Sequence, residues 1–303
     1  MIIDSHCHIG EYKDTKKAYS YVSNTQDLIN ILNTHGVQKA ICSPEPHGGL
    51  SFDENNTSHE ETAAINNIPY GQDNISLLKL KKAYDISNIL LPFRIIDTRK
   101  KIKEQIKLAE QQLKKDPLYG VKFHCQTLDV NIADIDNPTI MPFLKDAKLP
   151  VLLHTGIRKD KWLASHVLDA VEKHAEINFS IAHMGRFEKK FWDRYDKNGM
   201  PGNLFIDTSP FYAICNLSAS YKDKERLERI LDINYKNTED CFKMFVEKYK
   251  ENLMRGSDYP YISYPEYQGS YKENIDLLNT LDEETKGKIS YRNTLKFLGN
   301  NIV

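Results

Sequence analysis

Eight short apolar runs, rich in β-branched residues, recur along this 303-residue chain, and stretches with helical spacing lie between them. The runs occupy residues 2–9, 37–43, 89–95, 119–125, 149–156, 177–185, 203–209 and 251–258. Helical spacing is clearest in residues 25–35, 98–115 and 160–175. Eight strands that alternate with helices are the number a closed parallel (β/α)8 barrel needs.

An open, doubly wound sheet is the alternative architecture for this alternation. It usually carries a glycine-rich phosphate-binding turn after a strand, and no G-x-G-x-x-G or G-x-x-x-x-G-K motif follows any of the eight runs. No change in composition marks a domain boundary. The sequence therefore predicts an α/β protein, a (β/α)8 TIM barrel in a single domain over residues 1–303. Long loops should follow strand 2, at residues 44–74, and strand 7, at residues 209–240.

The composition narrows the class of partner. Lysine and arginine total 41 against 42 aspartates and glutamates, so no net field attracts nucleic acid or an anionic membrane. No apolar run approaches the roughly 18 residues that span a bilayer, and the segment MIIDSHCHIG lacks the pattern of a secretion signal. The five cysteines contain no C-x-x-C pair, which excludes a disulfide framework. We expect a cytoplasmic protein with a small-molecule substrate.

Polar residues recur where the predicted strands end. His6 and His8 lie two apart on the first strand, so both face the same side. His154, His183 and Asp258 end the fifth, sixth and eighth strands. The carboxyl ends of barrel strands meet at one mouth, where imidazole and carboxylate groups can bind a divalent metal ion. Each histidine alone could be a hydrogen-bonded core residue, but the set favours a metal site.

The motifs DSHCHIG, GVKFH, LLHTG, AHMG and GSDYP together resemble the amidohydrolase superfamily, in particular its amidohydrolase-2 branch. That branch contains metal-dependent TIM-barrel hydrolases and the decarboxylases related to aminocarboxymuconate semialdehyde decarboxylase. The resemblance implies that His6, His8, His154 and Asp258 are metal ligands. It also implies that Asp258 and His183 are catalytic.

The chemistry of such a site agrees with this assignment. A divalent ion held by imidazoles and one carboxylate lowers the pKa of water to about 7. Asp258 would accept the proton, and His183 could polarise the substrate. We expect one ion, Zn²⁺, with Mn²⁺ as the alternative.

Three further polar residues lie on predicted strands. Lys122 and His124 share a face of the fourth strand. The resemblance allows Lys122, once carboxylated, to bridge two metal ions, although the single-metal branch does not require this. We expect His124 to contact the substrate or a metal ligand. Asp207 ends the seventh strand, where it could contact a metal ligand or only cap the strand.

Two arginines follow strand-ending histidines closely. Arg158 comes four residues after one and Arg186 three residues after the other, so both should lie at the mouth and could bind a substrate carboxylate. Arg94 is a more distant candidate. The alternative is that these arginines form surface ion pairs with neighbours such as Asp160 or Glu188.

The sequence thus predicts a metal-dependent hydrolase acting on an amide, lactone or ester bond of a small anionic molecule. The alternative is a metal-dependent, non-oxidative decarboxylase of an unsaturated or aromatic carboxylic acid. A non-catalytic zinc-binding barrel is disfavoured, because a ligand set with an acid-base partner is seldom kept without chemistry. Barrels of this kind often pair, so a homodimer is one assembly the chain could form, although the sequence does not fix the oligomeric state.

Overall fold

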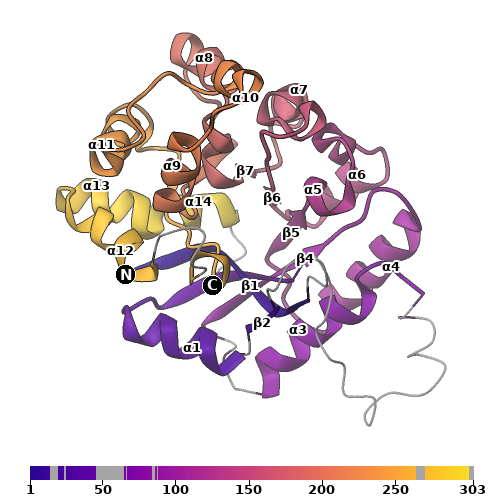
Figure 1. Ribbon diagram of the computed structural model, residues 1–303. Helices are drawn as coiled ribbons and strands as arrows, with labels where there is room; N and C mark the ends of the chain where they lie inside the picture. Colours follow the sequence, from indigo (N-terminus) through magenta and orange to yellow (C-terminus); the bar gives the residue numbers. More distant parts are fainter. Residues whose placement is uncertain are drawn as a thin grey trace.

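The computed structural model describes residues 1–13, 20–23, 25–45, 65, 67–83, 86, 88–263 and 270–299. Eight parallel strands form a nearly closed barrel inside a ring of helices (Figure 1). The strands are β1 (Ile3–Lys13), β3 (Lys39–Pro44), β4 (Leu90–Ile95), β5 (Gly120–Phe123), β6 (Val151–Leu153), β7 (Phe179–Ile181), β8 (Leu204–Asp207) and β9 (Leu253–Met254). Each lies within or overlaps one of the eight apolar runs, which confirms the (β/α)8 barrel.

The α-helices of the described residues surround these strands. They are α1 (Thr25–Thr34), α3 (Gly71–Ala83), α4 (Ile102–Leu113), α5 (Cys125–Leu128), α6 (Ile140–Asp146), α7 (Leu168–Lys173), α8 (Lys189–Asn198), α9 (Phe211–Ala219), α10 (Lys224–Arg229), α11 (Thr238–Tyr249), α12 (Tyr271–Asn279), α13 (Glu283–Gly287) and α14 (Asn293–Leu298). The helical spacing of residues 160–175 does not correspond to one continuous helix. Two 3₁₀ turns precede α7. They are separated by Leu163, which has an extended backbone and a buried side chain.

The barrel closes between its first and last strands through main-chain hydrogen bonds. The Ser5 amide donates to the Arg255 carbonyl at 2.9 Å. Three residues after Arg255, beyond the end of β9, the Asp258 amide donates to the His6 carbonyl at 2.8 Å. The closure therefore runs beside the residues that were predicted to bind metal.

One strand was not predicted. β2 (Ser20–Ser23) pairs antiparallel with the far end of β1, with Lys13 opposite Ser20. It extends the sheet by one strand beyond the barrel, next to β1.

Apolar side chains fill the interior at the amino-terminal end of the strands. They include Leu91, Phe93 and Phe205 from the strands, together with Phe297 from α14. α14 is held at this end, where the side-chain amide of Asn178, just before β7, donates to the Phe297 carbonyl at 2.9 Å. The bottom of the barrel is thus a packed core, and the polar strand-end residues are left to the opposite mouth.

The predicted long loops have different outcomes. Most of the loop after β3 lies outside the described residues. The loop after β8 is described and carries α9 and α10. Across the described chain, no helix is both long and apolar enough to span a membrane.

Candidate metal centre

The structure brings His6, His8 and Asp258 together at the carboxyl end of the barrel. The two histidine Nε2 atoms lie 3.0 Å apart, and Asp258 Oδ1 is 3.4 Å from each of them. All three side chains are buried. Asp258 reaches this position from a backbone in the left-handed region, with φ of 57°. These three predicted ligands therefore converge on one point.

His183 joins this group more closely than His154 does. One ligand atom each from His6, His183 and Asp258 lies within 4.8 Å of the other two, a spacing suited to a metal ion. His154 contacts His183 instead, with His154 Nδ1 2.9 Å from His183 Nε2. His154 Nε2 lies 3.1 Å from Gln126 Oε1 on its other side. His154 is thus next to the group rather than within it.

Asp207 orients His6. The Nδ1–H of His6 donates to Asp207 Oδ2 at 2.5 Å, and Ser209 Oγ lies 2.8 Å from the same nitrogen. This leaves the Nε2 lone pair of His6 facing the cluster, as in carboxylate–histidine–metal arrangements. Gly256 makes room for the carboxylate, since a Cβ at this position would lie 3.0 Å from Asp207 Cγ. Asp207 therefore contacts a predicted ligand, one of the two roles expected for it.

Two serines missed by the sequence analysis hold the other histidines. Ser43 Oγ lies 3.0 Å from Nδ1 of His8. Nδ1–H of His183 donates to the backbone carbonyl of Ser209 at 2.7 Å. Both serines are the last residues of predicted strand runs, 37–43 and 203–209, so their position was a signal that could have identified them.

Burial keeps three of these histidines neutral. It is the largest cause that lowers the pKa of His6, His154 and His183 well below the usual value, and the positive charges of Lys122 and Arg186 lower all three further. Neutral imidazole is the form that binds a metal ion. The donor set of nitrogen and carboxylate oxygen therefore fits a divalent ion such as Zn²⁺ or Mn²⁺.

Lys122 and His124 both reach the site, as their shared face predicted. Lys122 Nζ donates to His6 Nε2 at 2.7 Å, and burial lowers the pKa of this lysine to about 8. The ring of His124 stacks on that of His154, with centroids 3.8 Å apart. Lys122 is thus placed beside the predicted ligands, and His124 beside His154.

The turn after β7 has an unusual backbone. Residues 183–187 all have positive φ, and His183 has φ of 61° and ψ of 36°. Left-handed helical conformation costs about 1–2 kcal/mol for each residue with a Cβ, and Gly185 is the one glycine among the five. Such strain is characteristic of functional sites. Here it carries both His183 and Arg186.

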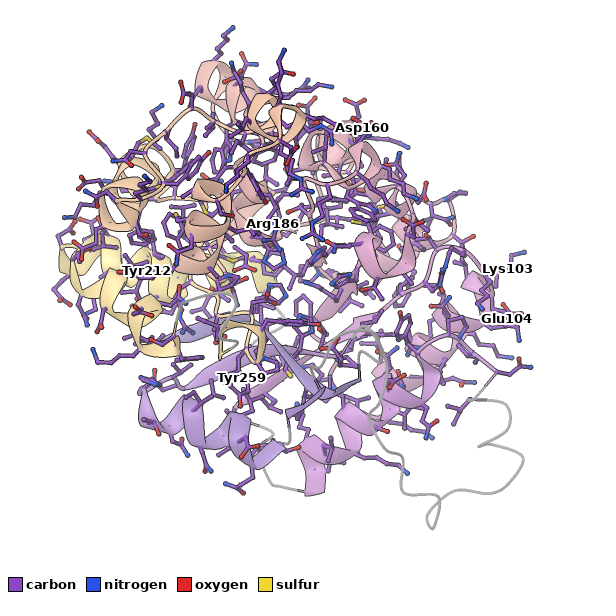
Figure 2. All side chains as sticks on the ribbon, viewed as in Figure 1. Lys103, Glu104, Asp160, Arg186, Tyr212 and Tyr259 are labelled. Atoms are coloured by element: carbon purple, nitrogen blue, oxygen red, sulfur yellow. The ribbon has the colours of Figure 1, made fainter. Side chains whose placement is uncertain are left out.

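Arg186 lies near the histidines, and Figure 2 shows it inside the ring of helices. It is half-buried. Among the charged groups that lower the pKa of His183, Arg186 has the largest effect, after that of burial itself. Arg158 is exposed. Burial raises the pKa of the Tyr221 phenol, and the charges of Arg186 and Arg158 both oppose this rise. Of the ion pairs found in the described residues, none joins either arginine to Asp160 or Glu188, the alternative considered from the sequence.

Arg94 is not at the mouth, so it is wrong as a candidate for substrate binding. Its buried guanidinium points away from the barrel interior and donates to Gln112 of α4. Burial lowers its pKa to about 9.

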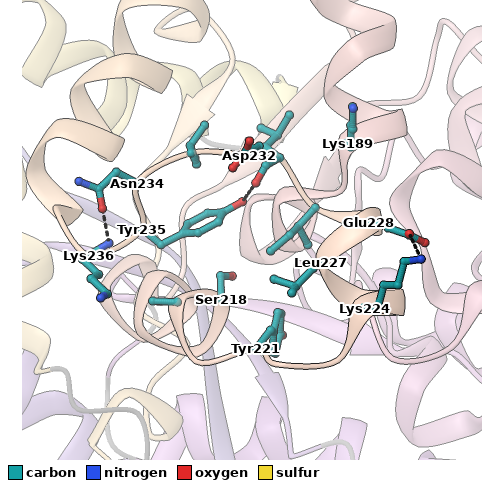
Figure 3. Close-up of a pocket in the computed structure, with 14 residues that line it drawn as sticks. Lys189, Ser218, Tyr221, Lys224, Leu227, Glu228, Asp232, Asn234, Tyr235 and Lys236 are labelled. Atoms are coloured by element: carbon teal, nitrogen blue, oxygen red, sulfur yellow. Dashed lines mark hydrogen bonds and ion pairs between the residues drawn. The ribbon is translucent and has the colours of Figure 1, made fainter.

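A separate cavity of about 850 Å³ lies in the loop after β8 (Figure 3). Tyr221, Leu227 and Tyr235 line it, together with lysines such as Lys189 and Lys236. None of the strand-end histidines lines this cavity, so it is distinct from the candidate metal centre.

The comparison with protein families identifies the class of this chain. The amidohydrolase-2 family model, described as amidohydrolase, matches residues 3–299, so the chain belongs to that family. Members of this family are metal-dependent enzymes, and they include hydrolases and decarboxylases. The search of curated proteins found no match.

Solved structures with the same fold include both kinds of enzyme. One, described as a "probable 2-pyrone-4,6-dicarboxylic acid hydrolase" from Acinetobacter baumannii with citric acid bound, is 19% identical, with a TM-score of 0.63 over 98% of this chain and 99% of that one. Another is 5-carboxyvanillate decarboxylase from Sphingomonas paucimobilis, 12% identical, with a TM-score of 0.56 over 98% of each chain. A third is the 5-carboxyvanillate decarboxylase of Novosphingobium aromaticivorans with bound manganese, 12% identical, with a TM-score of 0.53 over 89% of this chain and 80% of that one.

Proposed function

We propose that this protein is a metal-dependent hydrolase that cleaves an amide, lactone or ester bond of a small anionic molecule. The observation that supports this most strongly is the buried group of His6, His8, His183 and Asp258 at the barrel mouth. Neutral imidazoles with one carboxylate are the donor set of hydrolytic metal sites.

His6, His8 and Asp258 would hold the ion, and His154 is the fourth ligand that the family resemblance implies. Because His183 lies within the same group, it competes with His154 for that fourth place. We propose one ion per chain, Zn²⁺, with Mn²⁺ as the alternative. A lysine-bridged pair of ions would need Lys122, once carboxylated, as its bridge.

The chemistry that such an ion supplies is activation of water, whose pKa falls to about 7. Asp258 then accepts the proton of the attacking water and returns it to the leaving group. His183, held by its hydrogen bond to the Ser209 carbonyl, polarises the scissile carbonyl. Asp207 keeps His6 in the orientation that presents Nε2.

The charge of the substrate is proposed from the arginines. Arg186 is half-buried beside the histidines and has no ion pair to an acidic side chain among those found in the described residues. A guanidinium in this position can bind a carboxylate through two hydrogen bonds. Arg158, more exposed, and His124, stacked on His154, would complete the substrate contacts.

The test of the reaction begins with the metal. The purified chain should carry about one zinc ion, and His8→Ala should lose it, whereas the control His174→Ala should not, because His174 pairs with Asp136 outside the site. The metal-loaded protein is then tested in ¹⁸O-labelled water on anionic lactones, amides and esters, and on aromatic carboxylic acids. Incorporation of ¹⁸O into the product supports hydrolysis. Release of carbon dioxide without incorporation would show a decarboxylase instead.

The test of substrate charge uses methionine variants. Arg186→Met should raise KM for the anionic substrate at least tenfold, and Arg158→Met should raise it less, with zinc content unchanged in both. A neutral best substrate, or unchanged kinetics in both variants, would overturn this part of the proposal.

A cytoplasmic location and a homodimer are also proposed, on the sequence grounds given above. Cell fractionation tests the first, and sedimentation of the purified chain tests the second.

A further inference from the structure

A buried polar cluster lies on the outer side of the barrel where β1 meets β9. Asp4 Oδ2 is 2.8 Å from Arg255 Nη1 and accepts the Tyr271 hydroxyl hydrogen bond at 2.7 Å. The Arg255 guanidinium lies 4.4 Å from the Tyr271 ring centroid and donates to its hydroxyl oxygen at 2.9 Å. All three side chains are buried. The cluster therefore joins the first strand, the last strand and α12.

The other carboxylate oxygen of Asp4 contacts the backbone of both strands. Asp4 Oδ1 accepts from the His6 amide at 3.2 Å and from the Ser257 amide at 2.9 Å. Ser257 directly precedes Asp258. One oxygen atom thus links the main chain at one proposed metal ligand to the main chain next to another.

This link lies where the regular sheet is interrupted. The parallel pairing of β1 with β3 shifts register between Asp4 and Cys7, so the backbone at His6 leaves the regular ladder. The shift also explains the side chains: Asp4 and Cys7 both face the outer layer, whereas His6 faces the interior. At this interruption of the ladder, the His6 amide donates to the Asp4 carboxylate.

We propose that Asp4 is a positioning residue whose carboxylate, held by Arg255 and Tyr271, sets the separation of His6 and Asp258. It acts through the backbone and does not touch the ion. The inference rests on the proposed function, since it assumes that these two residues bind one metal ion. The inference identifies residues outside the mouth, namely Asp4, Arg255 and Tyr271, on which the geometry of the metal ligands depends.

The first experiment tests, in the absence of metal, whether Asp4 positions the backbone of the two strands. Amide hydrogen exchange is measured by mass spectrometry on the chelator-treated full chain for wild type, Asp4→Asn and Tyr271→Phe. Asp4→Asn should speed exchange at least tenfold in peptides covering residues 4–9 and 255–259, and Tyr271→Phe should speed it less. The control is Asn203→Ala, which removes buried hydrogen bonds to the carbonyls of Val171 and Ile177 at the opposite end of β8 from Asp207.

The second experiment measures zinc affinity by competition with a chromophoric chelator. Asp4→Asn should weaken zinc binding at least tenfold and Tyr271→Phe about threefold. Asn203→Ala should lower the unfolding midpoint but leave zinc affinity within twofold of wild type. A general loss of stability would move all three variants together, whereas a positioning role separates them.

The outcomes distinguish the two proposals. A wild-type chain that binds neither zinc nor manganese overturns the proposed function, and the exchange measurement then decides on the positioning role of Asp4 alone. Wild-type exchange and zinc affinity in a folded Asp4→Asn chain would overturn the positioning role. If Asp4→Asn does not fold, Tyr271→Phe decides by the same two measurements, and unchanged values in it overturn the role.

Discussion

The carboxylate of Asp207 determines which nitrogen of His6 faces the cluster. It accepts from Nδ1, so Nε2 is left for the site, and the same carboxylate is held by Ser209. Burial raises the pKa of Asp207 to about 6. A group whose pKa is higher in the folded state than in the unfolded state destabilises the fold when it is charged, which here is above about pH 6. The charged Asp207 carboxylate therefore lowers the free energy of unfolding.

We expect Asp207→Asn to lower zinc affinity by about 10- to 100-fold, because contacts of this kind tune metal binding by that amount. The unfolding free energy of the metal-free variant at pH 7 should not fall, since the buried charge is removed. Chelator competition and urea denaturation measure the two effects. Asp136→Asn is the matched control, as Asp136 makes the same kind of contact to His174 outside the site. Wild-type zinc affinity in Asp207→Asn would contradict the expectation.

At the scale of elements, the strands follow the apolar runs, but the turn that carries the candidate site residues His183 and Arg186 does not follow local preference. The turn of residues 183–187 is left-handed, although four of its five residues carry a Cβ. β4 and α4 meet through Arg94 and Gln112, a buried polar pair. Propensity alone predicts neither feature, because tertiary contacts outweigh it there.

Arg186→Gly should be more stable than Arg186→Ala by about 1 kcal/mol, because glycine adopts the left-handed region without the Cβ penalty. Arg186 has φ of 54°, within that region. Urea denaturation of the two variants gives the difference, and both lack the guanidinium, so its loss cancels. Equal stabilities would mean that the turn relaxes to ordinary φ values in solution.

The contact between Arg94 of β4 and Gln112 of α4 predicts that the single variant Gln112→Leu is less stable than the double variant that also replaces Arg94. Within the described residues, Arg94 Nε and Nη2 have no partner, and neither has Gln112 Nε2. Gln112→Leu should therefore cost about 2–3 kcal/mol of unfolding free energy by leaving the guanidinium unpaired. The double variant Arg94→Met/Gln112→Leu should return to wild-type stability or exceed it. A double variant less stable than Gln112→Leu alone would contradict this account.

At the scale of the molecule, the proposed ion lies where the barrel closes. His6 and His8 are on the first strand and Asp258 follows the last, and these ends are joined by few main-chain hydrogen bonds. A ligand that bridges both ends binds the folded state alone, so it stabilises the whole barrel by mass action.

Zinc at about 100 times its dissociation constant should raise the unfolding free energy by about 2.7 kcal/mol. The corresponding rise in Tm for a chain of this size is roughly 4 °C. Differential scanning fluorimetry of chelator-treated protein, with and without added zinc, measures it. His8→Ala serves as the control and should show no rise. An equal shift in His8→Ala would place the zinc elsewhere on the chain.

The sequence by itself determined the eight strands and the strand-end positions of His6, His8, His154, His183 and Asp258. It could do so because period-2 apolar patterning and parallel topology bring all carboxyl ends to one mouth. The tertiary structure alone decided that His183 stands closer to Asp258 than His154 does, since a left-handed turn sets its direction. It also decided that Arg94 faces away from the mouth and that Asp4 faces outward, because strand register and packing between layers have no local signal.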